Sequence, residues 1–209
     1  MKLIIVSGFL GAGKTISILS LADHILKITA KKNTSTTDGS GTKLVIIENE
    51  IGDVGFDDAM LSAKNYEVKN MLAGCICCTL ASDLTEELHS AAKTYDPEYV
   101  IFEPTGVAFP KNIIGKIEAY ATDVTSIRIV TVVDAYRWQK LIQVAPLLVQ
   151  GQVQCADLIL LNKADLVSTD LLETVRGEIR TLNPTAKIAT TVAQTGIESG
   201  IWDEVLRDA

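Results

Sequence analysis

Long apolar stretches, cysteines and positive charge are all scarce in this chain of 209 residues, and each scarcity excludes a class of protein. No stretch approaches the roughly 20 consecutive apolar residues that a membrane-spanning helix needs. Only four cysteines are present, and a chain of this size buries a core without disulfides or a structural metal. Positive charge is also short, since 19 Lys and Arg against 26 Asp and Glu leave a net charge of −7. That charge repels the phosphates of nucleic acids and of anionic lipids, so we expect no nucleic-acid and no membrane partner.

Apolar residues are plentiful, and at 47% of the chain they suffice for one domain spanning residues 1–209. The opening stretch MKLIIVSGFLGAGK has the charged-then-apolar order of a secretory signal. We reject that interpretation because glycines and Lys14 interrupt the stretch and no small-residue cleavage site follows. We therefore expect a cytoplasmic protein whose thiols are reduced.

Short, continuously apolar runs alternate along the chain with longer segments of helical periodicity. Continuous hydrophobicity is typical of strands that are buried on both faces, as in a parallel sheet. The expected strands are residues 3–6, 44–47, 99–102, 129–133, 158–161 and 188–192, and the expected helices are 16–27, 80–94, 112–121, 136–149, 169–182 and 201–206. This order predicts an α/β fold of three layers, with a mostly parallel sheet flanked by helices.

The segment GFLGAGKT, residues 8–15, has the spacing of a phosphate-binding loop and is called the P-loop below. Its glycines let backbone N–H groups surround phosphate oxygens, and the following helix adds its positive N-terminal end. Lys14 would bridge the β- and γ-phosphates, and Thr15 would place its hydroxyl on Mg²⁺. The expected nucleotide contacts are Gly8, Gly11, Ala12, Gly13, Lys14, Thr15 and Ile16. A glycine-rich turn without a ligand is the alternative, but the strand before and the helix after favour a P-loop NTPase.

The segment NKAD, residues 162–165, follows a buried run and is called the base loop below. The Asp165 carboxylate can accept two hydrogen bonds from the N1–H and N2–H₂ edge of guanine, which adenine does not offer, so GTP is expected. Lys163 would lay its methylene stem over the base, and Asn162 would brace the loop. The alternative is that Asn162 and Asp165 cap a turn and the next helix. A weaker motif, VAQTG at residues 192–196, would close over the base through Ala193.

Three further motifs complete a recognisable pattern: ENEIGDVGFD at residues 48–57, GCICCT at 74–79 and EPTGVAFP at 103–110. With the P-loop and the base loop, they closely resemble the CobW-type metallochaperone GTPases, which are relatives of the nickel-insertion GTPases HypB and UreG. The resemblance implies a GTPase that binds a transition metal at its CxCC motif. It also implies that the protein hands metal to a client protein or assists metallocofactor assembly, with cobalamin or corrinoid enzymes among the candidates.

The resemblance further implies roles for single residues. Glu48 and Asp53 would join Cys77 at the transition metal. Glu103 would lie near Mg²⁺, and the Gly106 amide would lie near the γ-phosphate. Family members often act as dimers, which implies a homodimer here.

The chain also departs from the family pattern. We expect the separate C-terminal domain of longer CobW proteins and their His-rich metal-holding tracts to be absent, which leaves client recognition open. Ile16 stands where a second Thr is common, and Pro104 stands where Thr or Ser is usual. Lys14, Thr15 and Glu103 remain, so the expectation of a GTPase stands.

Three of the four cysteines, Cys75, Cys77 and Cys78, lie within four positions. Thiolates suit Zn²⁺ and also accept Co²⁺, and ligands two and three residues apart on a turn can converge on one ion. Two alternatives remain: Cys75 and Cys78 as a CxxC redox pair, or the thiols packed as small apolar groups. Cys155 has no cysteine neighbour in the sequence and is expected in the core.

The acidic segment of residues 48–57 provides the remaining expectations. Glu48, Glu50 or Asp53 would complete a mixed sulfur and carboxylate shell around the transition metal. GTP and Mg²⁺ would hold residues 49–57 until hydrolysis releases them, so nucleotide and metal would change each other's affinity by the same factor. Lys14 would stabilise charge during hydrolysis, and Glu50 or Asp53 would orient the attacking water. A passive metal-binding module without turnover, or a P-loop small-molecule kinase, is the alternative.

Overall fold

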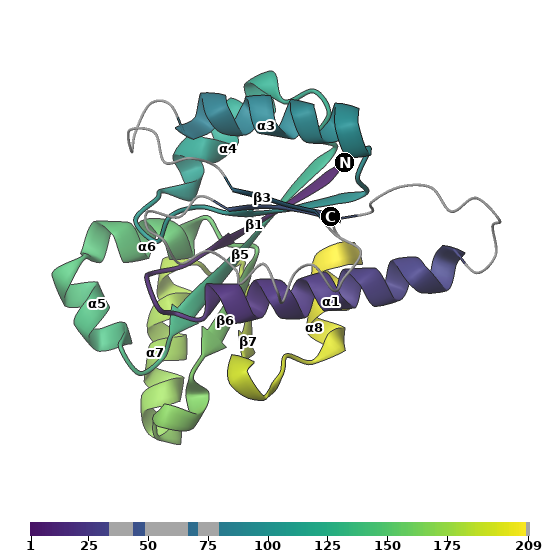
Figure 1. Ribbon diagram of the computed structural model, residues 1–209. Helices are drawn as coiled ribbons and strands as arrows, with labels where there is room; N and C mark the ends of the chain where they lie inside the picture. The colour runs from purple at the N-terminus through teal and green to yellow at the C-terminus, as the bar shows by residue number, and fades with distance from the viewer. Residues whose placement is uncertain (34–43, 49–66, 71–79, 208–209) are drawn as a thin grey trace.

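A computed structural model describes residues 1–33, 44–48, 67–70 and 80–207 of the chain (Figure 1). Its centre is a sheet in which every described strand pairing is parallel, with the strand order β3-β2-β4-β1-β5-β6-β7. The strands are β1 Lys2–Ser7, β2 Leu44–Glu48, β3 Glu67–Asn70, β4 Tyr99–Glu103, β5 Ser126–Asp134, β6 Leu158–Asn162 and β7 Lys187–Thr190. The predicted parallel α/β sheet is therefore confirmed.

Burial on both faces explains why the apolar runs form strands. All residues of β2 and β6 are buried, and so is β1 after its first residue. The edge strand β7 is partly exposed and ends at Thr190, two residues before the predicted end. The sequence analysis missed β3, whose residues EVKN carry one apolar side chain and so lack the run that marks the other strands.

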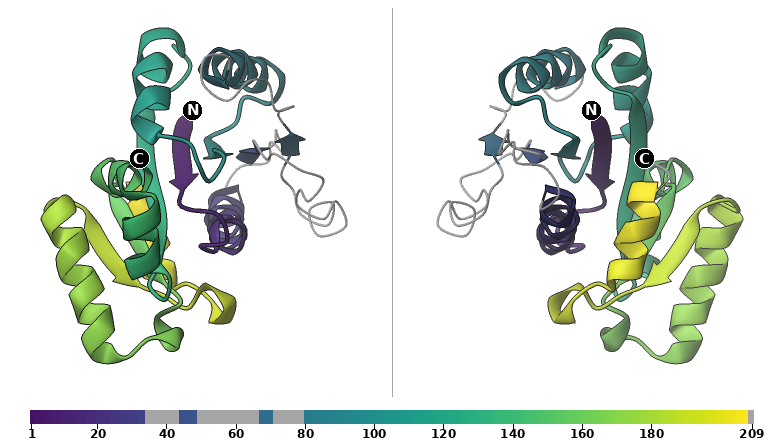
Figure 2. Two further views of the ribbon diagram at one scale, coloured as in Figure 1. Left: turned by 90° about the vertical axis from the view of Figure 1, so that its left-hand side faces the viewer. Right: turned by 90° about the vertical axis from the view of Figure 1, so that its right-hand side faces the viewer.

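Helices cover both faces of the sheet and complete three layers (Figure 2). They are α1 Lys14–Asn33, α3 Leu80–Tyr95, α4 Pro110–Tyr120, α5 Trp138–Val144, α6 Pro146–Gln154, α7 Thr169–Leu182 and α8 Ser199–Arg207. The first core cluster joins α1 and α8 to one face of the sheet. The other two clusters lie on the opposite face, where α3 and α4 pack beside α5, α6 and α7. None of the described helices is long and apolar enough to cross a membrane.

The prediction of a single helix over residues 136–149 is wrong, because this region contains two helices. Helix α5 ends where the Ala145 N–H donates to the Leu141 carbonyl, and Pro146 begins α6. Proline has no N–H to continue the first helix, and its fixed φ suits the first position of the second. The chain therefore turns at Ala145, and α6 runs back over the sheet.

Parallel strands deliver their following loops to one edge of the sheet, here the edge formed by their carboxyl ends. The P-loop follows β1, which lies between β4 and β5. The loop after β4, residues 104–109 (the Gly106 loop below), and the base loop after β6 reach the same edge. Segments that are 150 residues apart in the sequence thus meet in one place.

Candidate nucleotide-binding site

The P-loop adopts a backbone that only glycine readily takes at three positions. Gly8, Gly11 and Gly13 have φ values of +144°, +70° and +107°. A Cβ added to Gly8 would lie 2.4 Å from the Val132 carbonyl oxygen, and one added to Gly13 would lie 2.4 Å from Asn162 Nδ2. The glycines therefore permit both the turn and the close approach of the neighbouring strands.

Lys14 begins α1 directly after this turn, with its side chain buried. Its Nζ lies 3.4 Å from Glu103 Oε1 at the end of β4. Thr15 and Ile16 are exposed on the first turn of α1, while Ala12 is fully buried beneath the loop. An ammonium group, a hydroxyl and a carboxylate thus gather at the N-terminus of a helix, where the backbone favours anions. Hydroxyl and carboxylate oxygens are also the ligands that Mg²⁺ prefers, so this donor set fits the ion.

Glu48 lies at the end of β2 and is buried. In the register of β2 with β4 it stands directly opposite Glu103. The first residue of the acidic segment is therefore a neighbour of the carboxylate that contacts Lys14. This pairing places the start of the acidic segment two strands from the P-loop, with Glu103 on the strand between them.

Asn162 ties three segments together from a buried position. Its Nδ2 donates to the Ala12 carbonyl at 2.8 Å, and its Oδ1 accepts from the Ala193 N–H at 2.8 Å and from Thr191 Oγ1 at 3.4 Å. The side chain therefore links the P-loop to the segment after β7. These bonds are the kind by which Asn162 would brace the base loop, as the sequence predicts.

Lys163 has a left-handed backbone, with φ +61°, which directs its side chain back toward the P-loop. Its Nζ donates to the Gly11 carbonyl at 2.9 Å and to Asp134 Oδ2 at 2.7 Å. Asp165 is exposed on the short 3-10 helix Ala164–Leu166. A pocket of about 280 Å³ opens beside these groups and is lined by Gly11, Gly13, Ile16, Asn162, Lys163, Asp165, Leu166, Val192, Ala193 and Gln194. Seven of the predicted contact residues, Ala193 among them, thus line one cavity.

Asp134 and Arg137, which were not predicted from the sequence, lie between the P-loop and the base loop. The Asp134 side chain is fully buried at the end of β5 and accepts from Lys163 and from both the backbone N–H and Nε of Arg137. Burial alone raises the pKa of Asp134, but these hydrogen bonds outweigh it and hold the pKa below its usual 3.8. Arg137 Nη2 also donates to the Leu10 carbonyl at 2.7 Å. An acid after a buried run and an Arg three residues later were the available signals.

Gln152 of α6 is a second residue that the sequence did not suggest. It is buried, and its Nε2 donates to the Gly106 carbonyl at 3.1 Å and to the Ala108 carbonyl at 3.3 Å. Gly106 in turn packs on the P-loop, where an added Cβ would lie 2.9 Å from the Leu10 nitrogen. Gln152 therefore holds the Gly106 loop against the P-loop.

The predicted transition-metal ligands lie mostly outside the described residues. Glu50, Asp53, Cys75, Cys77 and Cys78 all belong to residues 49–66 and 71–79. Within the described ranges, no three His, Cys, Asp or Glu side chains are grouped so as to hold a metal ion.

Cys155 packs partly buried against the core cluster of α3 and α4, as predicted. Burial raises the pKa of its thiol. The two histidines lie in α1 and α3 and contact carboxylates, His24 with Asp203 at 2.7 Å and His89 with Asp123 at 2.9 Å.

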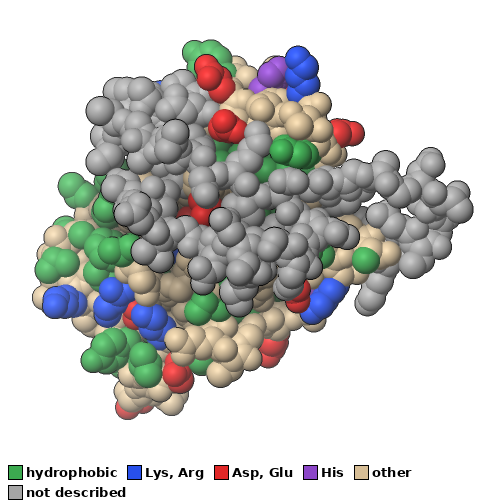
Figure 3. All heavy atoms as spheres, viewed as in Figure 1, with side chains coloured by type: hydrophobic (Ala, Val, Ile, Leu, Met, Phe, Trp, Pro, Cys, Tyr) green, Lys and Arg blue, Asp and Glu red, His purple; other side chains and the backbone are tan. Residues whose placement is uncertain are grey.

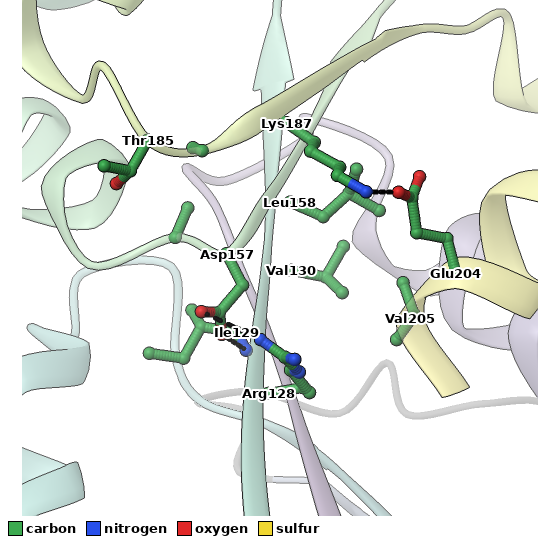
Figure 4. A pocket seen from close by; sticks show the side chains of 11 residues that line it. Arg128, Ile129, Val130, Asp157, Leu158, Thr185, Lys187, Glu204 and Val205 are labelled. Carbon is green, nitrogen blue, oxygen red and sulfur yellow. Dashed lines mark hydrogen bonds and ion pairs between the residues drawn. The ribbon is translucent and has the colours of Figure 1, made fainter. Parts of the chain in front are cut away.

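A separate pocket of about 250 Å³ lies at the opposite edge of the sheet (Figure 4). Its charged side chains form two ion pairs, Arg128 with Asp157 and Lys187 with Glu204. The floor between them is apolar, with Val130 and Leu158. Because the charges already compensate each other, this pocket does not have the character of a phosphate site.

Residues 2–190 match the family model described as the CobW/HypB/UreG nucleotide-binding domain. The chain is 28% identical over 223 residues to the zinc-regulated GTPase metalloprotein activator 1 of Dictyostelium discoideum, covering 88% of this chain and 44% of that one. It is 30% identical over 205 residues to the zinc chaperone CobW of a Sinorhizobium species, covering 84% and 54%. The chain thus spans about half the length of these curated relatives.

Solved structures share the fold. The Zn(II)-bound YjiA GTPase of E. coli superposes with a TM-score of 0.64 at 24% identity, over 97% of this chain and 60% of that one. The hydrogenase maturation factor HypB of Archaeoglobus fulgidus gives a TM-score of 0.60 at 16% identity, over 99% and 89%. The α/β fold predicted from the sequence is therefore shared with these two solved structures.

Proposed function

The chain belongs to the CobW/HypB/UreG family, and from this premise we propose that it is a GTP-binding and GTP-hydrolysing metallochaperone. It couples its nucleotide state to the holding and delivery of Zn²⁺ or Co²⁺. The observation that carries the proposal is the bracing of the P-loop by Asn162 and Lys163 of the base loop, around one cavity. The zinc chaperones and the zinc-regulated activator among its relatives support the metal part.

The residues at the nucleotide site would each bind a different part of GTP and its Mg²⁺ ion. Lys14 would exchange its contact with Glu103 for the β- and γ-phosphates, since phosphate carries more charge than one carboxylate. Thr15 and Glu103 would then hold Mg²⁺, which neutralises charge that develops on the phosphates. Asp165, exposed at the mouth of the cavity, would read the guanine edge, and Lys163 would lie along the base.

The metal half rests on residues around the acidic segment. Cys75, Cys77 and Cys78 would carry the transition metal, with Glu48 or Asp53 completing the shell. Glu48 stands beside Glu103 in the sheet register, so occupancy of the nucleotide site would be felt at the metal ligand. Linkage then requires metal to change GTP affinity by the factor with which GTP changes metal affinity. The client would be a metal-requiring protein or an enzyme of metallocofactor assembly, cobalamin or corrinoid enzymes included.

The test combines nucleotide competition with metal titration on the reduced protein. We expect GTP to outcompete ATP, and slow GTP turnover that changes when Zn²⁺ or Co²⁺ is added. Cys77→Ala should abolish tight metal binding, whereas the matched control Cys155→Ala should retain it, because Cys155 packs against the core. Preference for ATP would instead favour a small-molecule kinase. Binding of GTP with no turnover at any metal or protein concentration would favour a passive metal-binding module.

We further propose that the chain forms a homodimer at the P-loop. Leu10, Val107 and Phe109 are 67%, 49% and 41% exposed at the same edge of the sheet. Figure 3 shows hydrophobic side chains gathered with Lys and Arg side chains where Figure 1 draws α5 and α6. In sedimentation velocity with a non-hydrolysable GTP analogue, Leu10→Ser should weaken the dimer. Tyr120→Ser, at the far end of α4, is the control, and equal sedimentation of both variants would contradict this interface.

A further inference from the structure

Three consecutive carbonyl oxygens of the P-loop each accept a hydrogen bond from a different side chain. The pairs are Leu10 with Arg137 at 2.7 Å, Gly11 with Lys163 at 2.9 Å, and Ala12 with Asn162 at 2.8 Å. In a trans peptide the N–H points away from the C=O. Fixing the carbonyls of Leu10 and Ala12 therefore also fixes the directions of the Gly11 and Gly13 N–H groups. The N–H groups that would bind a phosphate therefore have fixed directions before the phosphate arrives.

Asp134 connects two of these three side chains. Its Oδ2 accepts from Arg137 Nε at 2.6 Å and from Lys163 Nζ at 2.7 Å, and its Oδ1 accepts from the Arg137 N–H at 3.0 Å. The carboxylate is fully shielded from water, where a charge is stable only with such partners. One buried anion thus orients one cation from its own loop and one from the base loop.

We propose that Asp134 and Arg137 are positioning residues that preset the P-loop for phosphate and couple it to the base loop. This inference rests on the proposed function of the same site. Arg137 acts through the Leu10 carbonyl, and Asp134 acts through Arg137 and Lys163, so neither has to touch the nucleotide. The guanidinium also flanks the loop, since an added Cβ on Gly11 would lie 3.3 Å from Arg137 Nη2.

The hydrogen bonds by which Asp134, Arg137 and Lys163 hold the P-loop carbonyls are called the brace below. Its position predicts which nucleotides should bind more weakly when it is lost. The P-loop contacts the phosphates that GTP and GDP share, so loss of the brace should weaken both nucleotides by a similar factor. ITP, which lacks the guanine 2-amino group, should lose affinity by that same factor. A change at Asp165 should instead depend on the base. Comparison of GTP, GDP and ITP therefore separates bracing of the phosphate site from recognition of the base.

The experiment measures equilibrium binding of the three nucleotides to the full chain, the parent and its variants. Each substitution removes a hydrogen bond to a charged group, so Asp134→Asn and Arg137→Gln should each weaken binding roughly tenfold or more. The double variant should lose less than the product of the two factors, because both residues act through one network. Arg137→Lys should recover part of the affinity, because it keeps a cation near Asp134. Asp157→Asn is the matched control, since this carboxylate pairs with Arg128 at the opposite edge.

A residue that served stability alone would change the melting temperature and leave nucleotide affinity of the folded protein unchanged. Arg137 is 35% exposed, so Arg137→Gln keeps the inference testable even if Asp134→Asn does not fold. Parent-like affinity for all three nucleotides in folded Arg137→Gln would overturn the brace. Unequal losses for GTP and ITP would overturn its assignment to the phosphate site. A parent that binds none of the three would instead overturn the proposed function, and the brace with it.

Discussion

Replacing Asn162 with Ala tests whether the bond between the base loop and the P-loop matters both for stability and for binding. The substitution leaves the Ala12 carbonyl and the Ala193 N–H buried without the partner that they now share. Each buried polar group that loses its partner costs about 1–3 kcal/mol, so the free energy of unfolding should fall by about 2–6 kcal/mol. In a chain of this size, that corresponds to a melting temperature lower by roughly 4–24 °C.

Asn183 offers a matched control, because it is also buried and also bonds to backbone groups. Its Nδ2 donates to the Val153 and Ala156 carbonyls at 2.9 Å each, and its Oδ1 accepts from the Ala186 N–H at 2.9 Å. These bonds lie at the amino edge of the sheet, away from the P-loop. Asn183→Ala should therefore destabilise the protein to a similar degree without changing the site.

The assay measures thermal unfolding and GTP affinity of both variants, with affinity determined well below each melting temperature. Asn162→Ala should lower both quantities, and GTP affinity should fall roughly tenfold or more because the Ala12 carbonyl is no longer held. Asn183→Ala should lower only the melting temperature. Equal GTP affinity in the two variants, or a melting temperature of Asn162→Ala that matches the parent, would refute the reasoning.

Three further changes have expected outcomes. Gly8→Ala should abolish GTP binding in an equilibrium assay, because the new Cβ would lie 2.4 Å from the Val132 carbonyl oxygen in a backbone with φ +144°. Gly177→Ala should raise the free energy of unfolding in urea by about 0.5–1 kcal/mol, since it lies inside α7 with nothing within 4 Å of the new methyl group. In the folded protein the pKa of Asp134 lies below its ordinary 3.8, so the ionised carboxylate stabilises the fold at pH values above 3.8. That contribution to the free energy of unfolding is lost as the pH falls through the lower pKa of the folded state. Unfolding titrations of Asp134→Asn should therefore show a shallower loss of stability in acid than the parent shows.

The sequence was sufficient for most of the fold because burial on both faces of a parallel sheet leaves a direct mark. Runs such as those of β1, β2 and β6 are apolar throughout since neither side of the strand meets water. The strand β3 leaves no such mark, because Glu67–Asn70 is short and largely polar and pairs only at the edge. The break at Ala145–Pro146 was visible as a proline, yet helical periodicity on both sides concealed it.

Some residues of the candidate site could be predicted from the sequence, and others could not. Glycine spacing and the NKAD motif carry information in the sequence itself, because the backbone demands glycine at Gly8 and Gly13. Asp134 and Arg137 leave only a weak signal and Gln152 leaves none, since their roles arise only when β5 and α6 are packed beside the P-loop. A buried acid or glutamine is common in any core. Its meaning depends on which carbonyl or cation the fold places opposite it.

Strand order explains how an acidic segment and a phosphate site can influence each other. β2 lies next to β4 and β4 next to β1, so Glu48, Glu103 and the P-loop occupy successive positions along one edge. Lys14 contacts Glu103 across this edge at 3.4 Å. A phosphate that draws Lys14 away changes the charge facing Glu103, and Glu48 stands on the adjoining strand. Because electrostatic interactions are strong between groups shielded from water, we expect that change to reach the start of the acidic segment without any large movement of the sheet.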